Sequence, residues 1–370
     1  MAIDEGLATQ TAYCKQVVVL AKPVVTTRSD TTLCTGKSVQ LTSTASGATT
    51  FSWSPTAGLS NATIASPVAT PAVSTTYIVT ANNGYCQSTD TVIINVVNNC
   101  AGISNIINAY TPVTGYQPCD NKITVESDAA FNVGDTVLLI QMKGAVIDTT
   151  NTAAFGTVTN YANAGNYEFN YVKSKANNVI ELQNKLTRQY TIPDGKVQLI
   201  RVPYFYSTNV SATLTCLPWD GSKGGVLAFN VRDTLTLNAD IDVSGKGFRG
   251  GVVKNSNINS FTCGINNYYY PINTIHAAGK GESIYDLDSL KNAGRGNKAS
   301  GGGGGMSPNT GGGGGGNGNV GGRGGYGYAD CPGYLTDQNW GLGGHILLYN
   351  TIQNKIYLGG GGGAGHCNNG

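Results

Sequence analysis

The glycine content of the C-terminal part constrains the fold of this chain more than any other feature. The stretch from Gly294 to Gly327 holds 19 glycines in 34 residues, with the runs Gly301–Gly305 and Gly311–Gly316, and a further run, Gly359–Gly363, follows. Glycine has no side chain to bury and loses more backbone freedom on folding than any other residue. The region is therefore either disordered or ordered by packing of main chain against main chain, and it is a poor place for a conventional active site.

Of these two states we expect the ordered one. Polyglycine can adopt the extended polyproline II helix, with three residues per turn and a rise of about 3.1 Å per residue, and neighbouring helices can exchange N–H···O and Cα–H···O bonds. Strand-like segments and cysteines punctuate the glycine tracts and would hold their ends. A flexible linker is the alternative. We therefore assign residues 207–370 to a glycine-rich β/polyglycine domain, which we expect to continue beyond Gly370.

The composition of the whole chain indicates an all-β protein and excludes several partners. Val, Ile, Thr and Tyr are common while good helix formers are scarce. Only 12% of residues are charged and the net charge is +2, so we expect no nucleic-acid partner. No run of 18 apolar residues occurs, so we expect no membrane span. The first residues lack the features of a signal peptide, and any export signal is expected to lie outside this sequence.

Residues 25–98 are predicted to form an immunoglobulin-like (Ig-like) β-sandwich, because short alternating runs are separated by turn-rich links. Cys34 and Cys86 lie near the starts of separate predicted strands, with Trp53 between them. A disulfide between two sheets, packed on a buried tryptophan, is a common feature of such sandwiches. We therefore predict a Cys34–Cys86 bond, with two unbonded buried thiols as the alternative.

Residues 1–24 are predicted to be the end of a preceding copy of the same module. Tyr13-Cys14 and Tyr85-Cys86 are both followed by an apolar β run, and such repetition is typical of arrays. Cys14 would then lack its partner, which explains the odd number of cysteines. Coincidence in a β-rich sequence is the alternative.

Residues 99–206 contain five or six alternating segments at short spacing, which predicts a β-barrel or a second sandwich. Cys100 and Cys119 bracket a short loop and are candidates to pair, although spacing alone does not determine connectivity.

The cysteines as a group indicate structural disulfides in an oxidising compartment. They are dispersed and contain no CxxC pair, which argues against a zinc ribbon or a thioredoxin-like motif. Eight are assigned to disulfides: Cys34, Cys86, Cys100, Cys119, Cys216, Cys263, Cys331 and Cys367. A Cys331–Cys367 bond is favoured over a metal site that would combine these residues with His366.

No motif predicts catalysis, a metal or a cofactor. Gly245–Gly250 matches GxGxxG, but no helix can follow it, so the phosphate site of a dinucleotide fold would be incomplete. The spacing of the three histidines, His276, His345 and His366, matches no zinc pattern. The carboxylate pairs Asp240/Asp242 and Asp286/Asp288 lack the spacing of a calcium loop and are expected to be solvated. We assign no catalytic residue and expect no enzyme.

The N-terminal repeat resembles the PKD/Ig-like repeats of Bacteroidota cell-surface proteins over residues 1–98. The resemblance rests on Leu33-Cys-Thr-Gly, Phe51-Ser-Trp-Ser-Pro-Thr-Ala-Gly-Leu-Ser, Thr75-Thr-Tyr-Ile-Val-Thr-Ala and Gly84-Tyr-Cys. It implies an exported protein of the type IX secretion class, with a role in gliding motility or adhesion. The C-terminal sorting domain of such proteins does not occur in this sequence.

A short triplet carries a second resemblance. Asp-[Ser/Thr] followed by an apolar residue or Thr occurs six times and resembles the O-glycosylation acceptor of exported Bacteroidota proteins. The alternative is that Asp-Thr simply begins strands after turns. The acceptors implied by the resemblance are Thr31, Thr91, Thr136, Thr149, Thr234 and Ser289.

Together these features predict an extracellular structural or adhesive segment of a long surface protein, such as a stalk, a filament or an attachment adhesin. Its partners would be surface glycans or other surface proteins and the secretion machinery. One alternative is a carbohydrate-binding module, since aromatic residues suited to sugar stacking are present. Another is a self-assembling fibre subunit. The aromatic candidates are Trp219, Tyr268, Tyr269, Tyr270, Tyr326, Tyr328 and Trp340.

Overall fold

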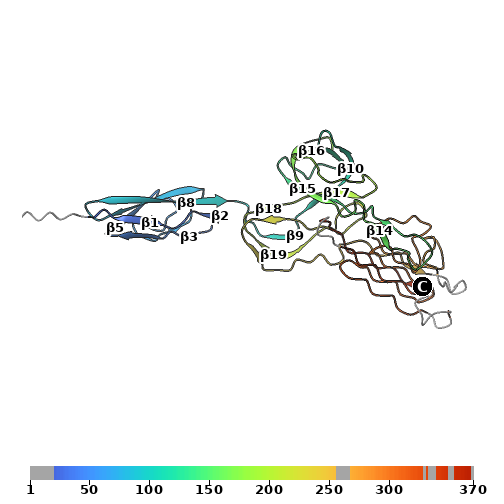
Figure 1. The fold of residues 1–370 in the computed structure, drawn as a ribbon. Helices are drawn as coiled ribbons and strands as arrows, with labels where there is room; N and C mark the ends of the chain where they lie inside the picture. The colour runs from blue at the N-terminus through green and yellow to red at the C-terminus, as the bar shows by residue number, and fades with distance from the viewer. Residues whose placement is uncertain (1–20, 256–266, 328–330, 332–338, 349–353, 368–370) are drawn as a thin grey trace, which may run out of the picture. The chain divides into compact units, whose positions relative to one another are not determined.

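A computed structural model describes residues 21–255, 267–327, 331, 339–348 and 354–367. The all-β prediction is confirmed: the described residues contain strands and extended segments but no helix (Figure 1). The chain divides into two compact units, Met1–Cys100 and Ala101–Gly370. The predicted N-terminal remnant, residues 1–24, lies almost entirely outside the described residues, as does Cys14.

The first unit consists of three small sheets around one apolar core. Strands β2, β8, β7 and β5 form the largest sheet in that order, and β1 pairs with β4 and β3 with β6. Its strands are β1 (Val24–Thr27), β2 (Thr31–Cys34), β3 (Val39–Gln40), β4 (Ser43–Ser46), β5 (Thr50–Ser54), β6 (Val68–Ala69), β7 (Thr75–Asn82) and β8 (Gln87–Val97).

Alternation along the strands places the apolar residues of this unit inside. In β7 the side chains of Tyr77, Val79 and Ala81 are fully buried. Trp53 is also buried, and its indole N–H donates to the backbone oxygen of Ile64 at 3.0 Å, so the polar edge of the ring is satisfied. The prediction of a tryptophan in the core is therefore confirmed.

The second unit begins with a closed barrel, in the order β10, β11, β16, β15, β12 and β17. Phe131, Leu139 and Leu199 are among the side chains that fill its core, each fully buried. The middle part of the chain therefore forms a barrel, one of the two architectures predicted. Its strands are β10 (Ala109–Gln117), β11 (Lys122–Val125), β12 (Thr136–Gln141), β15 (Tyr167–Ala176), β16 (Val179–Leu182) and β17 (Val197–Arg201).

Further strands, most of them short, lie outside the barrel, and several of them pair in parallel. Strand β19 lies between β9 and β21, parallel to both, and β18 is parallel to β20. The remaining strands of the unit are β9 (Ile103–Ile106), β13 (Val146–Ile147), β14 (Val158–Asn160), β18 (Tyr204–Phe205), β19 (Thr208–Thr215), β20 (Asn230–Val231), β21 (Leu235–Leu237), β22 (Lys254–Asn255) and β23 (His366–Cys367).

The glycine tracts are ordered and run side by side as extended segments, drawn in orange and red in Figure 1. Backbone N–H···O bonds link each segment to several neighbours, and almost none of these segments belongs to a regular sheet. We call the whole arrangement the glycine array. It comprises residues 247–254, 277–283, 293–306, 310–325, 339–347 and 356–366.

Hydrogen bonds in the glycine array repeat every third residue. The N–H groups of Gly360, Gly363 and His366 all donate to one neighbouring segment, 310–317, at 2.9, 2.7 and 3.0 Å. The N–H groups of the next residues, Gly361 and Ala364, donate to a different segment, 277–283. A direction that recurs every three residues is the geometry of the polyproline II helix, which makes no internal hydrogen bonds and so directs its donors outward. The expected order of the glycine tracts is therefore confirmed, and the spacing of their hydrogen bonds matches the threefold helix that polyglycine can adopt.

The close approach of these segments explains the need for glycine. A Cβ built on Gly303 would overlap the backbone oxygen of Arg295, and one on Gly281 would overlap the oxygen of Gly361. In both cases the obstacle is main chain, which cannot rotate away as a side chain can. By contrast, a Cβ on Gly322 meets nothing within 4 Å, so the requirement is specific to the interior of the array.

We therefore expect Gly303→Ala to lower the free energy of unfolding of the second unit by about 2–3 kcal/mol, because the added methyl forces neighbouring segments apart. Gly322→Ala is the matched control and should be close to neutral. Thermal and urea denaturation of both variants would measure the difference. Equal stability of the two variants would contradict the close packing described above.

Candidate functional site

The structure contradicts the predicted Cys34–Cys86 disulfide and places Cys34 in a bond with Cys100. The two Cα atoms lie 5.7 Å apart. The cause is the parallel pairing of β2 with the end of β8, in which Cys34 faces Val97. Cys86 precedes the start of β8 and lies about 35 Å away along that strand, estimated from the usual rise per residue. Cys86 is a free thiol.

The other predicted pairings also change. Cys119 cannot bond to Cys100, which is already bonded; it is an exposed free thiol in the turn after β10. Cys216 is a buried free thiol, and burial raises its pKa. Cys331 is disulfide-bonded to a partner outside the described residues, so the predicted bond to Cys367 does not form. Cys263 lies outside the described residues.

His366, Asp242 and Asp288, from the histidines and the paired carboxylates, each make hydrogen bonds to the backbone. His366 is buried, and its Nε2 lies 2.9 Å from the backbone oxygen of Ile275. Asp242 accepts from the backbone N–H of Ser244, and Asp288 from that of Leu290. Within the described residues, no three His, Cys, Asp or Glu side chains are grouped as a metal site would require.

The aromatic candidates are dispersed, and several contact other side chains. Trp219 is buried edge-on against Phe248 at 5.8 Å between ring centroids. The Arg295 guanidinium carbon lies over the Tyr268 ring, 4.8 Å from its centroid. The ring centroids of Tyr326 and Trp340 are also 4.8 Å apart. The remaining contacts are Tyr269 with Phe155 and Lys291, and Tyr270 with His276. Tyr328 lies outside the described residues.

The six candidate glycosylation acceptors all have some exposure. Thr91, Thr234 and Ser289 are exposed, whereas the other three are partly buried. Thr149 is also engaged, because its hydroxyl oxygen accepts a hydrogen bond of 3.2 Å from Lys291 Nζ. The partly buried acceptors are Thr31, Thr136 and Thr149.

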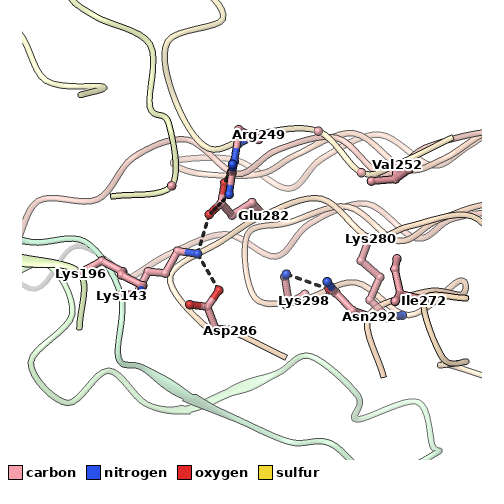
Figure 2. A pocket seen from close by; sticks show the side chains of 13 residues that line it. Lys143, Lys196, Arg249, Val252, Ile272, Lys280, Glu282, Asp286, Asn292 and Lys298 are labelled. Atoms are coloured by element: carbon pink, nitrogen blue, oxygen red, sulfur yellow. Dashed lines mark hydrogen bonds and ion pairs between the residues drawn. The ribbon is translucent and has the colours of Figure 1, made fainter. Parts of the chain in front are cut away.

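A cleft beside the glycine array brings together charged residues that sequence analysis did not group (Figure 2). Its volume is ≈ 580 Å³. Gly250 and Gly251 of the array line one part of it, and Val252 and Ile272 add apolar surface. The charged and amide side chains that line it are Lys143, Lys196, Arg249, Lys280, Glu282, Asp286, Asn292 and Lys298.

Glu282 is the centre of an ion-pair network in this cleft. Lys143 Nζ contacts Glu282 at 2.5 Å and Asp286 at 2.6 Å, and Arg249 Nε contacts the second oxygen of Glu282 at 2.9 Å. Burial would by itself raise the pKa of Glu282, but the hydrogen bonds from Arg249 and Lys143 outweigh this effect and lower it to about 2. The Glu282 carboxylate is therefore ionised over the whole physiological pH range.

Lys280 has no carboxylate partner among the described residues. Its ammonium group is buried and donates to three backbone oxygens, of Tyr268, Gly294 and Gly296, at 2.6, 2.9 and 2.6 Å. It also lies 4.6 Å from the centroid of the Phe155 ring. Burial, reinforced by neighbouring cations, lowers the pKa of Lys280 well below its ordinary value. These contacts hold the array segments around one cation.

Lys298 is also buried, with 3% of its surface exposed, but it is less well satisfied. Its ammonium group makes one hydrogen bond within the described structure, to Asn292 Oδ1 at 3.1 Å. Burial and the positive charge of Lys143 lower the pKa of Lys298 to about 8. Figure 2 shows the Lys298 ammonium between Asp286 and Asn292. Among the buried cations of the cleft, Lys298 thus has the most unused hydrogen-bonding capacity.

Local charge density is the sequence signal that could have identified this cleft. From Lys280 to Lys298, seven of 19 residues are charged, against 12% in the whole chain. Of these charged residues, only Asp286 and Asp288 were considered from the sequence. Lys143 and Arg249 lie far from it in sequence and are brought to it by the fold.

Comparison with known proteins does not place the chain in a family. No family model matches it, and no curated protein sequence matches it. Among solved structures, the titin domains Z1Z2 in complex with telethonin align at 13% identity over 45% of this chain and 82% of that chain, with a TM-score of 0.17. A chimeric titin Z1Z2 carrying a decorin peptide aligns at 12% identity over 44% and 82%, with a TM-score of 0.16. TM-scores this low establish no shared fold.

Nowhere in the described part of the chain is there a helix with the length and apolar character that crossing a membrane requires.

We expect Glu282→Gln to lower the free energy of unfolding at pH 7 by about 3 kcal/mol, because a buried carboxylate that pairs two cations is lost. The folded-state pKa of Glu282 lies below its unfolded value of 4.5, so its contribution is present above pH 4.5 and is lost as the pH falls toward 2. The wild type should therefore lose more stability than the variant over this range. Urea unfolding at several pH values would measure both.

Glu181→Gln is the control, since Glu181 pairs with the exposed Lys173 on the barrel. Surface pairs of this kind contribute little. If the Glu282 and Glu181 variants behaved alike, the cleft network would not contribute to stability.

Proposed function

We propose that this chain is an extracellular structural and adhesive segment of a long surface protein. The glycine array is the observation that carries the proposal. Its segments are joined laterally by backbone hydrogen bonds that repeat every third residue, so that load applied to one segment is shared by its neighbours. Such a layer needs few apolar side chains and suits a stiff element better than a catalytic site.

The disulfides support an exterior location for this segment. The Cys34–Cys100 bond joins the first edge of the sandwich to the residues that follow its last strand, and Cys331 is in a second disulfide. Bonds of this kind persist in oxidising environments and are rare in the cytosol. In this position the first bond would also prevent the sandwich from extending fully under tension.

The more specific proposal is a stalk or attachment adhesin of the Bacteroidota surface class, exported by type IX secretion. It is supported by the resemblance of residues 1–98 to the PKD/Ig-like repeats of those proteins. In that setting the Asp-Ser/Thr triplets would be O-glycosylated on the exterior. The described positions of the acceptors fit this idea, because none of them is buried.

Pulling single molecules from both ends would test the mechanical role. In non-reducing buffer the 66-residue loop between Cys34 and Cys100 should stay closed, and a reductant should add about 230 Å of extension at full stretch. The second unit should resist until a distinct rupture, at a lower force in Gly303→Ala than in Gly322→Ala. Gradual lengthening of the second unit without a rupture would contradict the proposal.

Intact-mass and peptide analysis of natively produced protein would test glycosylation. We expect added mass on tryptic peptides carrying the exposed acceptors Thr91, Thr234 and Ser289. The matched internal control is Thr213, which is exposed, does not follow an Asp and lies on a tryptic peptide without any of the acceptors. Unmodified mass on all of the acceptor peptides would reject the modification.

A further inference from the structure

The charges of the cleft beside the glycine array do not balance. Lys143 pairs with both of its carboxylates, Glu282 and Asp286, and Arg249 pairs with Glu282 as well. Three further lysines line the same cleft: Lys196, Lys280 and Lys298. Among the described residues, none of these three lysines makes an ion pair. If all the groups are ionised, the cleft therefore carries an excess of three positive charges.

Burial makes this excess unfavourable unless something offsets it. Lys280 and Lys298 are only 4% and 3% exposed. A buried cation without a counter-charge costs several kcal/mol. The carbonyl oxygens around Lys280 offset much of that cost, whereas the Lys298 ammonium, with three protons to donate, has one amide acceptor. Lys298 is therefore where an added acceptor would gain most.

The cleft also has room for a ligand. A volume of ≈ 580 Å³ lies in the usual range of small-molecule sites. Gly250 and Gly251 present bare backbone to the space, so a ligand can approach closely there. Val252 and Ile272 provide an apolar surface beside the cations. The lining thus combines cationic, backbone and apolar contacts.

We propose that this cleft binds a small ligand through an oxyanion (a carboxylate, sulfate or phosphate group) that accepts hydrogen bonds from Lys298, with Lys196 and Lys280 supplying further positive potential. Charge-assisted hydrogen bonds to an ammonium are about twice as strong as neutral ones, and they are stronger still where water is excluded. The oxyanion can belong to a free inorganic anion or to an acidic sugar. The site does not rest on the mechanical role proposed above, so either can fail without the other.

Isothermal titration calorimetry of the full chain at constant ionic strength tests this site. The probes are sulfate, phosphate and glucuronate, with glucose as a neutral control of similar size to glucuronate. Saturable binding of at least one anion, without binding of glucose, is expected. Tighter binding of glucuronate than of both inorganic anions would identify an acidic sugar as the source of the oxyanion, and similar or weaker binding would identify a free anion.

Lys298→Gln removes the charge while keeping a long polar side chain, and it should weaken anion binding by about tenfold or more. Lys196→Gln, at a half-buried position with little risk to folding, should weaken binding several-fold and keeps the test valid if the first variant does not fold. The control is Lys173→Gln, an exposed lysine on the barrel, which should bind like the wild type.

Three outcomes would overturn the proposal. The first is that none of the three anions binds saturably. The second is that folded Lys298→Gln and Lys196→Gln both bind with wild-type affinity. The third is a loss of anion affinity in Lys173→Gln equal to that in Lys298→Gln, which would show that anion binding depends only on the net charge of the protein.

Discussion

Main-chain hydrogen bonding between glycine segments is the interaction on which the second unit depends. A conventional domain gains stability by burying apolar side chains, but the glycine runs have none to bury, and the buried apolar residues of the array, such as Phe248, Leu347 and Tyr357, lie outside these runs. Instead, each extended segment directs its N–H groups outward in a threefold pattern and reaches a different neighbour with each successive residue. The neighbours lie so close that backbone oxygens occupy the space a Cβ would need at positions such as Gly281 and Gly303. Glycine is therefore a steric requirement of the array rather than a sign of flexibility.

The same close packing creates the unusual electrostatics beside it. Side chains are few, so the large ones that do occur in and around the array are surrounded by backbone. Lys280 shows this most clearly, since three carbonyl oxygens of neighbouring segments hold its ammonium group. The lysine acts as a bridge between the segment of Tyr268 and the glycine-containing segment of Gly294 and Gly296. Where the bridging is incomplete, as at Lys298, the result is a cation with unused donors at the wall of a cleft. The structural device and the candidate binding site thus have one physical origin.

Local patterns predicted the fold well and the cross-links poorly. Alternation of apolar and polar residues located the sandwich around Trp53 and the middle barrel, because a strand exposes one face and buries the other whatever its partner is. The disulfide of Cys34 depended on something local patterns do not contain, namely which end of β8 lies beside β2. Parallel pairing brought Cys100 to Cys34 and left Cys86 at the opposite end of the strand. The presence of Trp53 between the two cysteines suggested the wrong pair, since a tryptophan can fill a core without a disulfide beside it.

The sequence alone determined that the chain is β-rich, that its glycine tracts can bury almost no side chains, and that these glycines must pack backbone to backbone if they order. Composition and short-range periodicity are enough for such conclusions, because they follow from what each residue can bury. Only the tertiary structure decided which cysteines bond and that Lys143 and Arg249 meet Glu282, which lies more than 30 residues away from either in the chain. Ion pairs and disulfides require proximity in space, and proximity between distant segments is set by strand order and by the packing of the array, neither of which any single stretch of residues encodes.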